Sequence, residues 1–363
     1  MQNPVSIDLM SDQRLQATLS LQQRIGIDTE FMRERTFFSQ LCLVQIACGE
    51  LIFCVDTLAG IAARSSNAFW ESLLGIPWVL HSGRQDIEVI YQTAGKLPAS
   101  VFDTQIAAAL LGYTPQIGYA GLVADLFDVQ LAKSHTRADW SRRPLADSVL
   151  KYAAEDVLYL LPANDILRQR LDKLGRLAWA EQDSTDLLRP ALYDNDPNRA
   201  VARVKGAKNL QGVARQASVR LAAWREREAL RRNRPRQWII KDKTLLDIAT
   251  TQPSSPGELL TISGMPERSV HRAAADILAA IEAARSDECD YTPPGKPNQA
   301  QKAQLKQLQL CVSACAQDLG IATEIIAPKK ELATAVLTGH RNSRVFNGWR
   351  REIIGHKLLE QLE

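Results

Sequence analysis

The chain has 363 residues, of which 45% are hydrophobic and 23% are charged, and its formal net charge at pH 7 is +3. These proportions are ordinary for globular proteins and exclude a largely disordered chain, and the length predicts two or three domains. No apolar run approaches the roughly 18 residues that a membrane span needs, and the first residues do not resemble a signal peptide. We therefore expect a cytoplasmic protein with no membrane partner.

The first half of the chain predicts alternating strands and helices. Short apolar runs between polar turns are typical of strands, and apolar residues spaced three or four apart are typical of helices. We expect strands at 24–31, 41–47, 51–55 and 77–80, and helices at 11–22, 68–74, 84–94, 104–111 and 146–174. From residue 118 onward the pattern is helical. The sequence therefore predicts an α/β domain with a mixed sheet, followed by all-α domains.

The predicted strand at 24–31 contains two acidic residues, Asp28 and Glu30. Because side chains alternate faces along a strand, these carboxylates share one face, while Ile27 and Phe31 point the other way. Two like charges held side by side repel each other, and a hard divalent cation such as Mg²⁺ or Mn²⁺ offsets that repulsion. An edge strand with a solvated face would explain this D-x-E pattern by itself, so the metal hypothesis depends on the rest of the chain.

Another acid, Asp86, follows the strand predicted to end at Leu80. The turn at Gly83 and the helix that starts near Arg84 place Asp86 in a first helical turn, at the sheet edge where α/β proteins bind ligands. Simple compensation of the helix dipole is the alternative explanation. Asp103 immediately precedes a predicted helix, and we expect it to be an N-cap residue and not a catalytic one.

Tyr152 and Asp156 are four residues apart in the long helix predicted at 146–174. This spacing puts the phenol and the carboxylate on one helix face, whereas Glu155 points elsewhere and should be solvated. The alternative is a buried tyrosine that is hydrogen-bonded to a nearby acid and has a structural role only.

The combination of these patterns is more specific than any one of them. Four carboxylates can hold two divalent ions about 4 Å apart, which is the arrangement used for in-line displacement at phosphorus. One ion would lower the pKa of a bound water, the other would stabilise the leaving 3′ oxygen, and Tyr152 would orient the attacking water. The predicted catalytic residues are Asp28, Glu30, Asp86, Tyr152 and Asp156.

These residues lie in segments that resemble the DEDD exonuclease superfamily, in its tyrosine-bearing subgroup, and more closely the ribonuclease D family. The segments are 27–36 (IDTEFMRERT), 81–86 (HSGRQD), 139–145 (DWSRRPL) and 152–156 (YAAED). The related histidine subgroup has a histidine five residues before the last acid, where this chain has Lys151. The resemblance implies a ribonuclease-H-like fold and stepwise 3′→5′ release of nucleoside 5′-monophosphates from RNA.

The same resemblance implies which residues bind metal. Asp28, Glu30 and Asp156 would ligate it directly, and Asp86 would ligate it directly or hold it through water. The implied cofactors are two divalent metal ions, either Mg²⁺ or Mn²⁺.

The second half of the chain resembles the HRDC domain, a helical module that also occurs in helicases. The stretches 222–226 (AAWRE), 238–240 (WII) and 262–265 (ISGM) carry this resemblance, and residues 298–363 resemble a second, more divergent unit after a proline-rich linker. The predicted parts are an exonuclease domain at 1–190, a linker at 191–208, an HRDC domain at 209–289 and a second HRDC-like domain at 297–363.

The small net charge conceals a basic segment between Val201 and Arg236. It contains eleven lysine and arginine residues and two glutamates, a local net charge of +9. A solvated helix face usually carries acids at i,i+4 spacing, and their scarcity here favours contact with nucleic acid. The predicted nucleic-acid-binding residues are Arg142, Arg143, Arg203, Lys205, Lys208, Arg215 and Arg225.

Together these patterns predict a metal-dependent 3′→5′ exoribonuclease, a monomer that trims the 3′ ends of precursor tRNA and other structured RNAs. The same chemistry on DNA is one alternative, because the contacts that sense a 2′-hydroxyl are not visible in a sequence. A non-catalytic RNA-binding scaffold is the other, and the presence of all four acids speaks against it.

Overall fold

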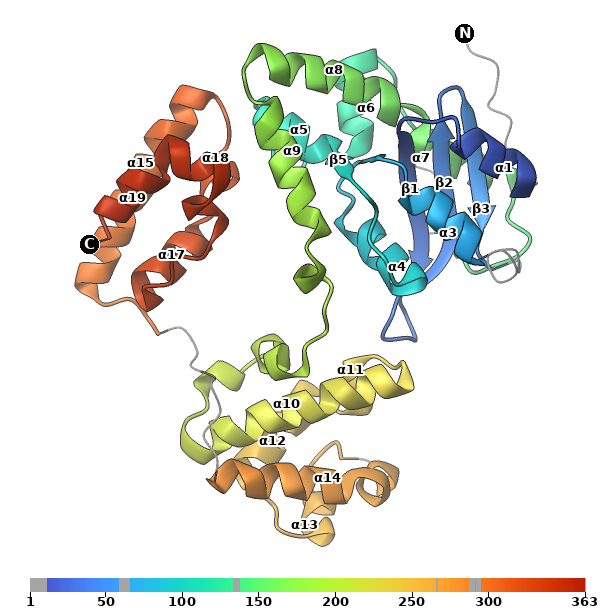
Figure 1. Ribbon diagram of the computed structural model, residues 1–363. Helices are drawn as coiled ribbons and strands as arrows, with labels where there is room; N and C mark the ends of the chain where they lie inside the picture. Colours follow the sequence, from blue (N-terminus) through green and yellow to red (C-terminus); the bar gives the residue numbers. More distant parts are fainter. Residues whose placement is uncertain are drawn as a thin grey trace. The chain divides into compact units, whose positions relative to one another are not determined.

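The protein is described by a computed structural model that covers residues 12–58, 66–132, 138–265, 267–286, 291 and 295–362. The chain forms two compact units (Figure 1). The sheet unit comprises Met1–Met32, Leu41–Leu192 and Pro294–Glu363, and the helical unit comprises Arg33–Gln40 and Tyr193–Pro293. The predicted junction between the two HRDC-like domains lies mostly outside the described residues.

The sheet unit is built on five strands in the order β3-β2-β1-β4-β5. β1 (Ile25–Met32), β4 (Trp78–Leu80) and β5 (Val101–Asp103) are parallel, whereas β2 (Gln40–Cys48) and β3 (Leu51–Asp56) pair antiparallel. The predicted mixed sheet is confirmed, and four strands lie close to their predicted positions. The sequence does not predict β5, because this short strand ends at Asp103, the residue that caps α5, and the helix signal conceals it.

The long helix predicted at 146–174 is two helices in the structure. α7 (Asp147–Leu158) ends before Tyr159, and α8 (Leu160–Lys173) begins directly after it. Pro162 explains the division, because proline has no N–H to continue the hydrogen bonds of α7 but is tolerated in the first turn of a new helix. The other helices of this half are α1 (Asp12–Leu19), α3 (Ser66–Leu74), α4 (Arg84–Ala94), α5 (Thr104–Leu110), α6 (Tyr119–Phe127) and α9 (Leu177–Thr185).

The last helices of the chain belong to the sheet unit, although the sequence predicts a separate domain at 297–363. Leu308 and Val312 share one buried apolar core with Ala107 of α5 and Leu167 of α8. This common core explains why the segment belongs to the same compact unit. Its helices are α15 (Gln299–Leu319), α16 (Thr323–Ile326), α17 (Lys329–Thr338), α18 (Gly348–Arg350) and α19 (His356–Glu360).

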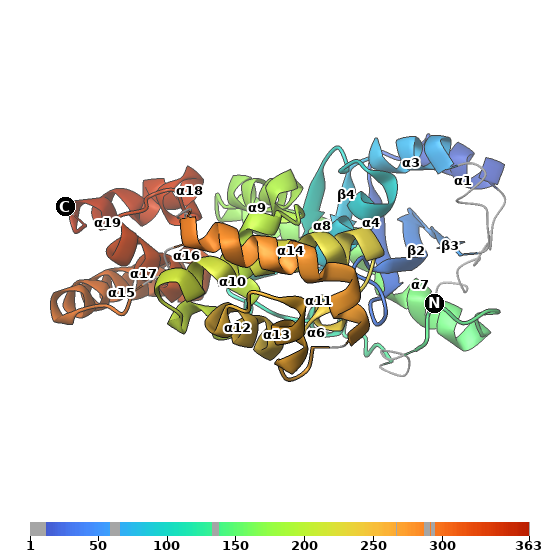
Figure 2. The same ribbon diagram turned by 90° about the horizontal axis from the view of Figure 1, so that it is seen from below.

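The helical unit confirms the predicted helical region after the sheet. α10 and α14 lie side by side in it (Figure 2) and bury Leu221 and Ile277 in its core. Its elements are η3 (Pro197–Arg203), α10 (Gly212–Arg232), α11 (Arg236–Ile239), α12 (Asp242–Thr251), α13 (Pro256–Thr261) and α14 (Glu267–Ser286). None of the described helices combines the length and the apolar composition that a membrane span requires.

The segment Arg33–Gln40, which follows β1 in the sequence, is part of the helical unit. Phe37 is only 2% exposed and lies in the same core as α10, and the guanidinium of Arg236 lies over its ring at 4.4 Å. The side-chain oxygen of Asn233 accepts hydrogen bonds of 3.0 Å from the backbone N–H groups of Phe37 and Phe38. Asn233 can do this because it ends α10 in the left-handed conformation that asparagine tolerates.

Candidate active site

Strand β1 presents Asp28 and Glu30 on one face. Both acids are half-buried, whereas Ile27, which points to the other face, is 1% exposed. β1 lies between β2 and β4 and is therefore an interior strand that holds its side chains firmly. Gly26 permits close packing beneath the acids, because a Cβ there would lie 3.2 Å from the Cβ of Leu160 at the start of α8.

Asp156 approaches these two acids from α7, which packs against β1 and β3. Asp28, Glu30 and Asp156 each have a carboxylate oxygen, and these three oxygens lie within 4.8 Å of one another. The structure thus brings together three of the four predicted metal ligands, which come from segments far apart in the sequence.

Asp86 lies in the first turn of α4, as predicted, and is 7% exposed. Its Oδ1 accepts a hydrogen bond of 2.5 Å from Oγ1 of Thr29, the residue between Asp28 and Glu30. Asp86 therefore contacts the strand that carries the other acids through Thr29, and it is not one of the three acids whose oxygens cluster within 4.8 Å.

The turn before α4 is held by Asp103. The side chain of Asp103 accepts a hydrogen bond from the backbone N–H of Gln105 at 2.8 Å, so it is the N-cap of α5, as predicted. It also accepts hydrogen bonds from the N–H groups of Ser82 at 3.0 Å and Gly83 at 2.9 Å. This second role, which the sequence does not predict, fixes the turn that leads to Asp86.

Burial is the largest cause that raises the pKa of each of the four acids. Burial, followed by the charges of Asp156 and Asp86, raises the pKa of Glu30 to about 8. Burial raises the pKa of Asp156 to about 7 and that of Asp86 to about 6, and burial together with the three other acids raises the pKa of Asp28 well above its usual value. The folded site therefore disfavours four negative charges, and a bound cation would relieve that penalty.

Tyr152 lies beside this cluster on α7. Burial and the charges of Asp156, Glu30 and Asp28 raise the pKa of its phenol to about 12. The ring of the buried Trp140 lies 6.4 Å from the Tyr152 ring, between centroids. Tyr152 is therefore neutral near pH 7, and its hydroxyl can donate and accept hydrogen bonds.

A second tyrosine, Tyr119, lies near the acids and is not predicted from the sequence. Its hydroxyl accepts a hydrogen bond of 2.9 Å from the backbone N–H of Tyr159. Burial raises its pKa well above the usual value, and the charges of Asp156 and Asp28 add to the rise. No spacing or motif links Tyr119 to the acids, so no sequence signal could have identified it.

The cluster of Asp28, Glu30 and Asp156 suits a hard divalent cation. Its donors are carboxylate oxygens, which Mg²⁺ and Mn²⁺ prefer, and they converge on a single half-buried site. A bound cation would offset both the burial and the repulsion that raise the pKa values of Asp28 and Glu30. The described residues thus fit the metal-dependent chemistry that the sequence predicts.

Four of the predicted nucleic-acid contacts have internal partners, and Arg143 and Arg225 have the most extensive ones. Arg143 donates to both carboxylate oxygens of Asp56 at 2.6 Å and to the backbone oxygen of Cys42 at 2.9 Å. Arg225 is 2% exposed and donates to Asp242 at 2.7 Å and to the backbone oxygen of Ile240 at 3.2 Å. We therefore assign Arg143 and Arg225 structural roles in place of RNA contacts.

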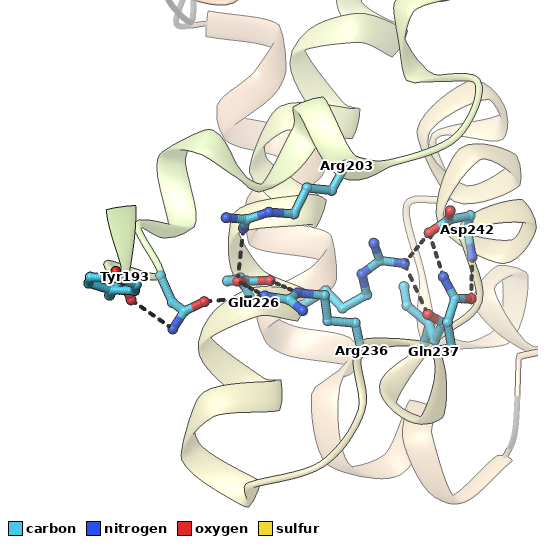
Figure 3. A network of polar contacts seen from close by, with 9 residues as sticks. Tyr193, Arg203, Glu226, Arg236, Gln237 and Asp242 are labelled. Atoms are coloured by element: carbon cyan, nitrogen blue, oxygen red, sulfur yellow. Dashed lines mark hydrogen bonds and ion pairs between the residues drawn. The ribbon is translucent and has the colours of Figure 1, made fainter. Parts of the chain in front are cut away.

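A buried glutamate, Glu226, also binds two arginines of the basic segment, Arg203 and Arg236 (Figure 3). Glu226 is 1% exposed and accepts hydrogen bonds from Arg236 at 2.5 and 2.6 Å and from Arg203 at 3.2 Å. The Nε of Arg215 donates to the backbone oxygen of Leu210 at 2.8 Å. Three other predicted contacts, Arg142, Lys205 and Lys208, are exposed. Among the described residues, no hydrogen bond of this kind is found for their side chains.

Comparison with known proteins agrees with this architecture. A family model described as 3′-5′ exonuclease matches residues 11–172, and a model of the HRDC domain matches residues 215–281. The chain is 36% identical to the ribonuclease D of Gluconacetobacter diazotrophicus, over 92% of this chain and 86% of that protein. It is 34% identical to the ribonuclease D of Xanthomonas oryzae pv. oryzae, over 94% and 93%.

A solved structure is similar over the full length. The crystal structure of Escherichia coli RNase D, an exoribonuclease involved in structured RNA processing, superposes with a TM-score of 0.83 at 26% identity, covering 100% of this chain and 99% of that one. The mixed sheet, the matched exonuclease and HRDC models and these relatives lead to one conclusion: the chain belongs to the ribonuclease D family of 3′→5′ exoribonucleases.

Proposed function

We propose that this enzyme trims the 3′ ends of precursor tRNA and other structured RNAs, one nucleotide at a time, with two divalent ions at the acidic cluster. The observation that carries the proposal is the convergence of Asp28, Glu30 and Asp156, whose oxygens lie within 4.8 Å of one another. This kind of site suits hydrolysis at phosphorus, because two metal ions can stabilise both the attacking and the leaving oxygen.

Each acid has a role in this proposal. Asp28, Glu30 and Asp156 ligate the ions, and Asp86 ligates an ion directly or holds it through water. When bound, Mg²⁺ or Mn²⁺ supplies the positive charge that lowers the pKa of the attacking water and stabilises the leaving 3′ oxygen.

Tyr152 orients the attacking water. Its phenol is neutral near pH 7, and the rise of its pKa to about 12 keeps it neutral in alkaline solution as well, so the hydroxyl can hold a water by a hydrogen bond. The oxygen of that water attacks phosphorus opposite the 3′ oxygen, the bond from phosphorus to the 3′ oxygen breaks, and the leaving oxygen gains a proton. The products are a nucleoside 5′-monophosphate and an RNA shortened by one nucleotide.

RNA contacts are assigned to exposed basic residues. Arg142, Lys205 and Lys208 are exposed. In the helical unit, a groove of about 590 Å³ between α10 and α14 is lined by the exposed Arg227, which adds a further cation that can approach phosphates. The relative from Escherichia coli processes structured RNA, which supports precursor tRNA as a substrate. We take the monomer as the active form because one chain supplies all four acids and Tyr152.

Labelled oligomers test this proposal directly. The purified protein is incubated with Mg²⁺ or Mn²⁺ and with RNA and DNA of the same sequence, each labelled at the 5′ end or at the 3′ end. We expect the 5′-labelled RNA to shorten one nucleotide at a time, the 3′ label to appear as a mononucleotide, and EDTA to stop both. Asp156→Asn is the matched control for a contaminating nuclease.

Two outcomes would overturn the proposal. Internal cuts, or removal of nucleotides from the 5′ end, would contradict the direction. Faster shortening of the DNA oligomer than of the RNA oligomer would contradict RNA as the preferred substrate.

A precursor tRNA with a 3′ extension, given to the same preparation, should be shortened only in the extension.

A further inference from the structure

Thr29 lies between two predicted metal ligands and points away from both. Alternation along β1 puts its side chain on the face opposite Asp28 and Glu30. There the side chain is buried, 6% exposed, and its hydroxyl donates to Oδ1 of Asp86 across 2.5 Å. Strand β1 therefore carries Asp28 and Glu30 on one face, and Thr29 on its other face contacts Asp86.

The contact with the Thr29 hydroxyl helps the Asp86 side chain to keep one orientation. A carboxylate in the first turn of a helix can occupy several rotamers, and its free rotation would move its oxygens by ångströms. Threonine is well suited to hold it, because a β-branched side chain in a strand has restricted χ1 and presents its hydroxyl in a fixed direction.

The backbone around Asp86 has separate support. Asp103 accepts hydrogen bonds from the N–H groups of Ser82 and Gly83, in the turn before α4, at 3.0 and 2.9 Å. Loss of the Thr29 hydroxyl should therefore loosen the Asp86 carboxylate, which also has backbone hydrogen bonds from Thr29 and Asp86, and leave the turn in place. This makes a positioning role distinguishable from a role in folding.

We propose that Thr29 is a positioning residue for catalysis: its hydroxyl fixes the carboxylate of Asp86 relative to the cluster of Asp28, Glu30 and Asp156. The inference rests on the proposed function, because it assumes that Asp86 acts together with these three acids. Hydrogen-bond partners of metal-binding side chains commonly control metal affinity in this way.

Three variants separate the hydroxyl from the shape of the side chain. Thr29→Val keeps the branching and removes the hydroxyl, Thr29→Ser keeps the hydroxyl, and Thr29→Ala removes the hydroxyl without placing a methyl group against Asp86. Thr93→Val is the matched control, because Thr93 is on the same helix as Asp86 and donates only to the backbone oxygen of Val89.

Two measurements are made on each variant. Turnover and KM are measured on a short 5′-labelled RNA, and Mn²⁺ binding is measured without RNA by electron paramagnetic resonance. We expect Thr29→Val and Thr29→Ala to lower turnover by about 10- to 100-fold with little change in KM, and to weaken Mn²⁺ binding by about tenfold. Thr29→Ser should restore most of both losses, and melting temperatures should stay close to that of the wild type.

The inference fails if Thr29→Val or Thr29→Ala keeps wild-type turnover and Mn²⁺ affinity. It also fails if Thr29→Ser is as impaired as they are, since the hydroxyl would then not be the cause. Should Thr29→Val not fold, the comparison of Thr29→Ala with Thr29→Ser decides. Failure of the proposed function looks different, because the wild-type protein itself would then neither bind Mn²⁺ nor shorten RNA.

Discussion

Asp183 accepts two hydrogen bonds of 2.6 Å from the guanidinium of Arg350, one on each carboxylate oxygen. The pair joins α9 to the C-terminal helices, and the two side chains are only 10% and 2% exposed. Trp349, next to Arg350, stacks on Trp179 of α9 with ring centroids 4.4 Å apart and planes inclined by 5°. Both contacts lie within the sheet unit, and we expect them to stabilise it.

The first prediction concerns this ion pair. Arg350→Met keeps the length of the side chain but leaves the charge of Asp183 buried without its partner, so it should lower the free energy of unfolding by about 3 to 5 kcal/mol. Urea denaturation measures the change, and Arg351→Met, at an exposed position, is the control. A loss below about 1 kcal/mol would mean that the pair contributes little.

Because of this pair and the common core, we also expect a chain that ends near Tyr193 to be unstable.

The second prediction concerns the metal ligands. Asp28→Ala, Glu30→Ala and Asp156→Ala should each lower turnover on the order of 10³-fold, about 4 kcal/mol of activation free energy, because each removes a group that positions the ions. Glu155→Ala is the matched control beside Asp156 and should keep most activity. If Asp156→Ala kept a tenth of wild-type turnover, Asp156 would not be a metal ligand.

The third prediction concerns Tyr152. Tyr152→Phe keeps the ring next to Trp140 and deletes only the hydroxyl that orients the attacking water. We expect turnover to fall roughly 10- to 1000-fold while KM changes little. Steady-state kinetics on a short RNA measures both constants. Unchanged turnover, or an effect on KM alone, would make Tyr152 a packing residue.

The fourth prediction concerns RNA binding by the helical unit. Replacement of both Lys205 and Lys208 by alanine should weaken tRNA binding and reduce the salt dependence of the affinity. Each lost phosphate contact lowers the log–log slope by close to one unit on a duplex and by less on a single strand. Fluorescence anisotropy between 50 and 200 mM salt, about the range over which such slopes are measured, provides the test.

A second double variant controls for the loss of charge itself. Lys302 and Lys306 are exposed on α15, outside the basic segment, so their replacement by alanine changes the net charge equally. Equal salt slopes for the two double variants would contradict a direct role of Lys205 and Lys208.

The fifth prediction concerns Gln45 in β2. Its side chain is 0% exposed, and neither its amide oxygen nor its amide nitrogen has a hydrogen-bond partner. An unpaired buried amide lowers stability, so Gln45→Met, which has a similar length, should raise the free energy of unfolding by about 1 kcal/mol. Chemical denaturation checks this, with exposed Gln116→Met as control. A loss of stability would indicate that a buried water pairs with the amide.

The sequence by itself was sufficient for features that depend on near neighbours. Alternation along one strand puts Asp28 and Glu30 on the same face, and i,i+4 spacing puts Tyr152 and Asp156 on the same face of a helix. The N-cap role of Asp103 is likewise a relation between adjacent residues, and the structure shows it. Such features can be predicted because covalent geometry decides them.

Only the tertiary structure decided which distant groups meet. The position of β1 in the sheet and the packing of α7 against it bring Asp156 to the acids of β1. Arg225 looks like an RNA contact in a basic segment, but Asp242 and the backbone oxygen of Ile240 bind it in the interior. A sequence gives the sign of a segment's net charge. The direction in which each charged side chain points depends on the helices and strands packed around it.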